Sequence, residues 1–74
     1  MTFAHRHKRF MRVVDRIEPK NNAEIIICSY LLSSQNPRAT LAFADSFKSK
    51  LNPTRRLKIR SEIASLLESH PIER

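Results

Sequence analysis

Few residues of this chain have the side chains and the spacing that catalysis or metal binding would need. His5 and His7 are the closest pair of possible metal ligands, but residues two positions apart on a helix point in different directions. Cys28 is the only cysteine, and neither it nor His70 lies at a familiar zinc spacing from the two histidines. No acid is placed by its spacing to orient a base beside Cys28. We therefore expect no enzyme, no metal site, no cofactor and no small-molecule substrate.

Basic residues are the more informative feature. The chain carries 14 Lys and Arg against 7 Asp and Glu, a formal net charge of +7. Lys48–Arg60 alone holds six cations and no acid, and residues 1–20 hold six cations and two acids. Basic zones of this kind are suited to a polyanion or to an acidic protein surface, or they only keep a small apolar protein soluble.

The two basic zones predict a basic face on ordered helices. In a helix from Phe3 to Glu18, the cations would lie on one side and the apolar residues on the opposite side. The cationic stripe would be about 15 Å long at 1.5 Å per residue. That length would span several phosphates of a duplex. In the second zone, the cations fall in the first turns of a helix, where the dipole attracts anions. The predicted basic face consists of Lys8, Arg9, Arg12, Arg16, Lys48, Lys50, Arg55, Arg56, Lys58 and Arg60.

Length and composition restrict the fold and the compartment. Seventy-four residues make one domain with a modest core. The chain has no glycine, which hairpins and phosphate-cradling loops use at positive φ, so we expect an all-α fold. The apolar run Ile25–Cys28 is too short to cross a bilayer, and the N-terminal residues lack a signal-peptide apolar region, so no membrane association is expected. A lone cysteine fits a reducing compartment, the cytoplasm or the nucleus.

Apolar spacing predicts four helices with short connections, hence a small four-helix bundle or an orthogonal helical array. Pro19 would end the first helix, and Asn21 with Glu24 predicts a capping box at the start of the second. Asn36-Pro37 and Asn52-Pro53 each place a capping asparagine before a proline at the first helical position. The predicted helices span residues 3–18, 22–34, 37–51 and 53–69.

The second predicted helix is apolar around most of its circumference. Its run Ile25-Ile26-Ile27 is β-branched and is also compatible with a buried strand, although no second strand is available to pair with it. We expect three short neighbouring helices to leave part of this helix uncovered. Self-association would remove that surplus from water, so the sequence leaves a homodimer and a monomer as alternatives.

A basic amphipathic segment, residues 1–20, is thus followed later in the chain by a helix-turn-helix-like pair, residues 37–70. The exposed positions of the first helix of the pair are small or acidic, and the tight glycine turn common in DNA-binding pairs is missing. We therefore expect little base-specific readout.

A turn at Pro53 follows the apolar residues Phe43, Phe47 and Leu51. After the turn the chain is basic, and its apolar pattern ends in the pair Leu66-Leu67. This order, over residues 43–68, resembles the BESS motif, a two-helix interaction module of insect chromatin and transcription factors that often follows a MADF DNA-binding domain. No MADF-like domain is expected in the 42 residues before it, which contain no tryptophan. The resemblance implies homo- or hetero-association through the apolar faces. The contact residues that it implies are Phe43, Phe47, Leu51, Ile59, Ile63, Leu66 and Leu67.

Two functions follow as predictions. The first is a non-enzymatic protein–protein interaction module or regulator that self-associates and captures a partner, in a transcription, chromatin or phage–host context. An inhibitor from a phage or mobile element, which meets an acidic host surface with its basic face, would have the same composition. The second is direct, largely sequence-independent nucleic-acid binding through the basic face. The sequence leaves DNA, RNA and an acidic protein surface as alternative partners.

Overall fold

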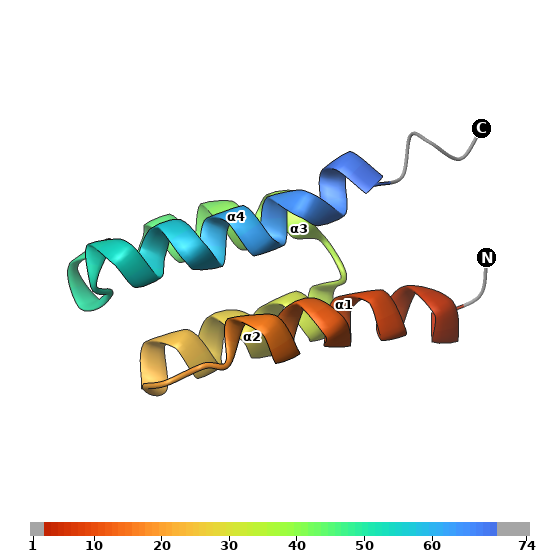
Figure 1. Ribbon diagram of the computed structural model, residues 1–74, viewed down its shortest axis with the longest axis horizontal. Coiled ribbons are helices and arrows are strands. Elements are labelled where there is room, and N and C mark those ends of the chain that lie inside the picture. The colour runs from red at the N-terminus through yellow and green to blue at the C-terminus, as the bar shows by residue number, and fades with distance from the viewer. Residues whose placement is uncertain (1–2, 70–74) are drawn as a thin grey trace.

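Four helices pack side by side in the computed structural model, which describes the backbone of residues 3–69 and the side chains of residues 7–47 and 49–67 (Figure 1). No strand occurs in this described part of the chain. The predicted all-α fold is confirmed, and its form is a small bundle. The elements are α1 (Phe3–Ile17), α2 (Asn22–Ser34), α3 (Pro37–Asp45), a short 3-10 turn η1 (Lys48–Lys50) and α4 (Pro53–Ser69).

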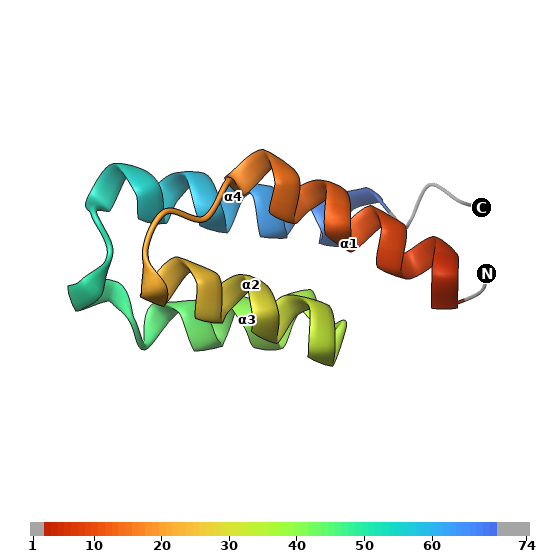
Figure 2. The same ribbon diagram turned by 90° about the horizontal axis from the view of Figure 1, so that it is seen from below.

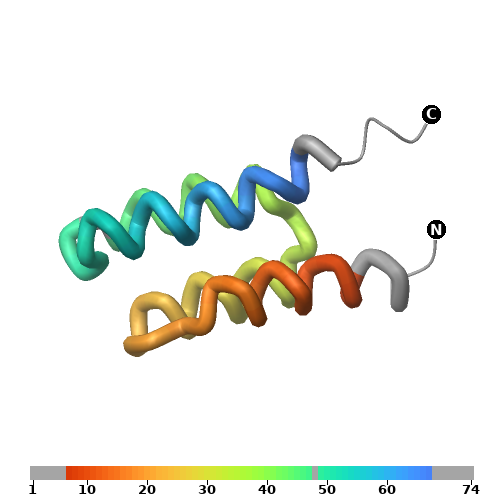
Figure 3. The backbone as a smooth tube through the Cα atoms, viewed as in Figure 1, coloured from red at the N-terminus to blue at the C-terminus, as the bar shows by residue number. Residues whose placement is uncertain are grey.

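The helices occupy the corners of a square. In Figure 1 α4 and α3 lie above α1 and α2, and after the 90° turn of Figure 2 α1 and α4 form one layer and α2 and α3 the other. The main contacts accordingly join α1 with α2, α2 with α3, α3 with α4, and α4 with α1. The backbone tube shows the chain reversing direction at each connection (Figure 3). Consequently α2 lies diagonally across the bundle from α4.

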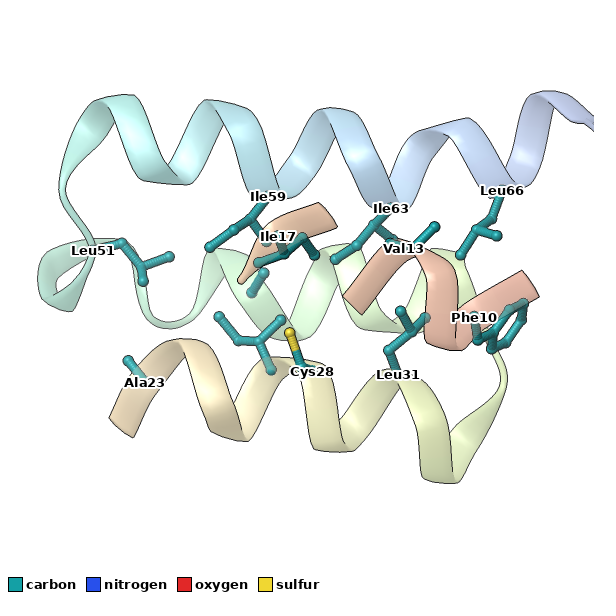
Figure 4. Packing of buried hydrophobic residues seen from close by; sticks show 12 residues of the cluster. Phe10, Val13, Ile17, Ala23, Cys28, Leu31, Leu51, Ile59, Ile63 and Leu66 are labelled. Carbon is teal, nitrogen blue, oxygen red and sulfur yellow. The ribbon is translucent and has the colours of Figure 1, made fainter. Parts of the chain in front are cut away.

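Apolar residues at helical spacing fill the space between the four helices (Figure 4). Burying one large aliphatic side chain contributes roughly 1.5–3 kcal/mol, so this cluster is the main source of stability. Val14, Leu32, Leu41, Phe43 and Phe47 are partly buried against it. The buried cluster consists of Phe10, Val13, Ile17, Ala23, Ile27, Cys28, Leu31, Ala44, Leu51, Ile59, Ile63 and Leu66.

Local signals place the helix starts where the sequence predicts them. The side-chain oxygen of Asn36 accepts a hydrogen bond from the Ala39 N–H at 3.0 Å, and that of Asn52 accepts from the Thr54 N–H at 2.9 Å. Each asparagine satisfies an N–H that the first helical turn leaves without a partner. The two predicted Asn-Pro helix starts are therefore confirmed.

The third helix is shorter than predicted, because it ends at Asp45 and not at residue 51. The Ser46 hydroxyl donates to the Phe43 carbonyl at 2.6 Å, and the Phe47 N–H donates to the Ala44 carbonyl at 2.9 Å, an i to i+3 bond. A serine that bonds the preceding turn competes with the α-helical pattern and favours the tighter 3-10 winding. The change of direction brings Leu51 into the core.

Two helices end in left-handed residues although the chain has no glycine. Glu18 follows α1 with φ 53°, and Gln35 follows α2 with φ 52°. Their N–H groups donate to the carbonyls of Val14 and Leu31, which closes the last turn of each helix. Because a side chain with Cβ is disfavoured there by roughly 1–2 kcal/mol, both positions carry backbone strain.

The second helix resolves two predictions. It is helical through Ile25-Ile26-Ile27, so the strand alternative is wrong. The predicted capping box is half formed: Asn21 accepts from the Glu24 N–H at 3.0 Å, but the Glu24 carboxylate accepts from the Lys20 N–H at 2.6 Å. Glu24 is buried. Its carboxylate turns inward because it has a partner on α4.

Candidate nucleic-acid interface

Arg55, predicted on the basic face, is a structural residue. Its Nη2 donates to Glu24 Oε1 at 2.8 Å and its Nε donates to Oε2 at 3.1 Å. The same Nη2 donates to the carbonyls of Ile17 at 2.8 Å and Glu18 at 3.1 Å. One side chain thus joins the start of α4 to the start of α2 and the end of α1. Arg55 therefore has partners within the chain, and its place on the basic face stays a prediction.

This pairing keeps the buried carboxylate charged. The hydrogen bond from Arg55 is the largest effect and lowers the pKa of Glu24, with further lowering from the Lys20 N–H, whereas burial acts in the opposite direction. The hydrogen bond to Glu24 likewise raises the pKa of Arg55. Both groups are therefore ionised in the fold at neutral pH.

Other cations of the Lys48–Arg60 block also pair within the chain. Arg60 Nη1 lies 2.5 Å from Asp45 Oδ1, and Arg56 Nη2 lies 3.4 Å from the same atom. These pairs tie α4 to the end of α3, and they offset part of the local charge. Lys50 and Lys58 are exposed, and the Lys48 side chain lies outside the described residues.

The apolar seam implied by the BESS resemblance is largely used by the chain itself. Leu51, Ile59, Ile63 and Leu66 are buried in the core, where α1 and α2 cover them. The other three residues of the seam are half-buried. Two of them, Phe43 and Phe47, belong to an aromatic stack with Tyr30. In that stack, the Tyr30 and Phe43 centroids are 4.3 Å apart, and Phe43 meets Phe47 edge-on at 5.0 Å. As folded, the four buried residues present no surface to a partner. The half-buried members of the seam are Phe43, Phe47 and Leu67.

Three cations of α1 lie at a groove between α1 and α4. We call this feature of about 270 Å³ the arginine groove; its buried apolar residues are Val13 and Leu66, and its polar residues are three arginines and a serine. Arg16 is held by Glu62, with 2.7 Å between Nε and Oε1. Arg12 is exposed and forms no ion pair with the side chains that the structure describes. The lining residues are Arg9, Arg12, Val13, Arg16, Ser65 and Leu66.

The groove presents its charge along a straight helix. From Arg9 to Arg16 the rise is roughly 10 Å at 1.5 Å per residue, the axial rise of about three phosphates of one strand. On α4, Lys58 is exposed one helical turn before Glu62, on the same side of the helix. Lys8 is exposed on α1 as well. Of the residues of the predicted basic face, Lys8, Arg12 and Arg16 are thus exposed on α1, and Lys58 is exposed on α4.

Cys28, the candidate nucleophile, lies inside the core. Cys28 is buried among the core residues, and burial, aided by the charge of Glu24, raises the pKa of its thiol to about 11 (Figure 4). The side chains of His5 and His70 lie outside the described residues. Among the described residues, no group of three or more His, Cys, Asp or Glu is able to hold a metal ion. Within the same part of the chain, no helix combines the length and the apolar character needed to cross a membrane.

Three residues that α4 contributes to this site, Glu62, Ser65 and Leu66, are not marked by the sequence as part of it. Glu62 is the partner of Arg16, although the two are 46 residues apart and Asp15 is the nearer acid in the chain. Ser65 and Leu66 complete the groove from α4. Only the contact between α1 and α4 reveals these partners, and no local spacing marks them.

No protein-family model matches this sequence, and neither the curated proteins nor the solved structures contain a match. The BESS resemblance stays a prediction.

Proposed function

We propose that this protein binds nucleic acid by contacting the phosphate backbone through the arginine groove. The observation that carries the proposal is the alignment of Arg9, Arg12 and Arg16 along one groove between α1 and α4. A guanidinium presents a planar fork of N–H donors that matches phosphate oxygens, and it stays charged at any physiological pH. Ser65 adds a hydroxyl on the opposite wall.

Electrostatics supports the same proposal. Arg55, Arg56 and Arg60 are tied to acids of the chain, and Arg16 is tied to Glu62, whereas Lys8, Arg12 and Lys58 are exposed. The net charge of +7 attracts a polyanion from a distance. The groove is the site where we propose that the attracted polyanion binds. Phosphate contacts position a protein without reading bases, so the expected binding is largely independent of sequence.

The proposal predicts a measurable salt dependence. Fluorescence anisotropy of a labelled 20-base-pair duplex, and of the matching single strand, gives the affinity as salt is raised from about 50 mM to about 200 mM. Three phosphate contacts give a slope of roughly −3 in log K against log salt for a duplex and roughly −2 for a single strand. No binding to either at about 50 mM salt would refute the proposal.

A protein–protein interaction module or regulator is the second candidate. The observation that favours it is the exposure of two large apolar side chains on α2, Ile25 at 49% and Ile26 at 45%. An apolar surface of this kind is typical of a contact with another protein. The two candidates are compatible, because the groove and these isoleucines lie on different helices. A transcription, chromatin or phage–host setting would suit either one.

A further inference from the structure

The outward face of α2 carries no charged side chain. The only charged residue of this helix is Glu24, and it is buried. Each of the other three helices exposes at least one cation among its described side chains. In a chain with 28% charged residues, an uncharged exposed face along a whole helix is the exception. The exposed residues of α2 are Asn22, Ile25, Ile26, Ser29, Ser33 and Ser34.

Large and small residues are separated along this face. Ile25 and Ile26 lie at its N-terminal end, and Ser29 and Ser33 follow on the same side at i+3 and i+4 spacing. When two copies of α2 are antiparallel about an axis at Ser29, the isoleucines of each copy meet the serines of the other. A contact in which each copy supplies the ridge and the recess is the self-complementary arrangement that two-fold symmetry requires.

Charge selects a second copy as the occupant. Two molecules with +7 each repel, and they can approach closely only where neither presents a cation. An acidic partner would be drawn to α1 instead, where the exposed cations lie. The outward face of α2 is thus the surface of the described bundle where a copy of the same chain meets the least repulsion.

We infer that the protein forms a two-fold symmetric homodimer through antiparallel packing of its outward α2 faces. Because α2 lies diagonally across the bundle from α4 (Figures 1 and 2), a contact through the outward face of α2 leaves the α4 wall of the arginine groove outside the interface in both copies. A 13-residue helix is roughly 20 Å long, so the contact falls at the lower end of specific interface sizes. We expect a dissociation constant in the micromolar range, on the order of 10 μM.

Sedimentation velocity across about 1 μM to about 500 μM, in about 300 mM salt to limit repulsion, tests this inference. The wild-type chain should pass from monomer to dimer, and Ile26→Glu should stay monomeric, because it places two like charges in an apolar contact. Leu57→Glu is the matched control: this leucine on α4 is 68% exposed, and its replacement should leave the dimer intact. Circular dichroism establishes that both variants stay helical.

Cross-linking tests the geometry separately. Ser29→Cys places a thiol at the two-fold axis, and it should form a disulfide-linked dimer under mild oxidation, whereas Ser61→Cys, exposed on α4, should not. Cys28 is buried and present in both variants, so it cancels in the comparison. A wild-type chain that stays monomeric over the whole range would overturn the inference. A dimer equally tolerant of Ile26→Glu and Leu57→Glu, or equal cross-linking at residues 29 and 61, would overturn the proposed interface.

Discussion

Arg55 on α4 and Glu24 on α2, 31 residues apart in the chain, form a two-pronged ion pair at 2.8 and 3.1 Å. The Glu24 side chain is 2% exposed and that of Arg55 is 21% exposed. The same guanidinium bonds the carbonyls at the end of α1. This residue, in the middle of the most basic stretch of the sequence, therefore acts on the fold, and the ligand surface that we propose lies on α1 instead.

Replacement of Arg55 should destabilise the fold strongly. Arg55→Met leaves the buried Glu24 carboxylate without its counter-ion, which costs about 3–5 kcal/mol in comparable buried pairs. Urea unfolding followed by circular dichroism measures the loss. Arg12→Met is the matched control, because Arg12 is exposed without an ion pair to a described side chain, and it should change the free energy of unfolding by less than about 0.5 kcal/mol.

The double variant Glu24→Leu/Arg55→Met separates the cost of an unpaired Glu24 carboxylate from the loss of the other Arg55 contacts. Because it removes the buried charge together with its partner, it should be more stable than Arg55→Met alone. A double variant no more stable than Arg55→Met would show that loss of the Arg55 contacts to the α1 carbonyls, and not the unpaired carboxylate, carries the effect.

The Glu24 pair should make stability depend on acidity. The pKa of Glu24 is lower in the fold than its ordinary value of 4.5, so the stabilisation is complete above about pH 4.5 and is lost as the pH falls through the lowered value. The free energy of unfolding of the wild type should therefore fall more steeply below pH 4.5 than that of Glu24→Gln. Parallel pH profiles for the two proteins would rule out this assignment.

Cys28 should be protected by the fold. Because burial raises its pKa from 9.0 to about 11, the native thiol is almost entirely protonated at pH 9. Iodoacetamide should then react far more slowly with the native protein than with the protein in urea. The raised pKa of Cys28 also makes the free energy of unfolding depend on pH, with the opposite sign to Glu24. The stabilisation from Cys28 is present below pH 9.0 and is lost as the pH rises toward about 11. Equal alkylation rates in buffer and in urea would contradict the burial of this thiol.

Gln35 is a position where glycine should stabilise the protein. Its φ of 52° disfavours a side chain with Cβ, and its Nε2 atom is buried without a hydrogen-bond partner in the described structure. Gln35→Gly should raise the free energy of unfolding by about 0.5–1 kcal/mol. Ser34→Gly, one residue earlier and still helical, should lower it by about the same amount. Destabilisation by both changes would show that the Gln35 side chain is needed.

Most of the fold could be predicted because its signals are local. Asn36 and Asn52 precede prolines, and these pairs define helix starts without knowledge of any distant residue. The end of α3 at Asp45 was missed because the Phe43–Leu51 apolar pattern continues past it, and the serine that ends the helix resembles any surface serine. The left-handed residues were missed because Glu18 and Gln35 stand where glycine usually gives the signal.

The site was predictable only in part. Helical spacing placed Arg9, Arg12 and Arg16 on one side of α1, as the structure does. Sequence reasoning gave Arg55 the same role as Arg12, because charge and position in a helix do not show which guanidinium meets a buried acid. That difference depends on Glu24, which becomes the partner only when α2 and α4 are brought together.

The central claim is that the arginine groove, and not positive charge in general, binds the phosphate backbone. The direct test compares two double variants that each lose two positive charges: Arg9→Gln/Arg12→Gln in the groove and Arg38→Gln/Lys50→Gln outside it. Anisotropy with the labelled duplex at about 50 mM salt gives the affinities, and a salt series gives the slopes. The groove variant should bind at least about tenfold more weakly, with a slope reduced by about 2, and the other variant should stay close to wild type. Equal losses of affinity in the two variants would contradict the claim.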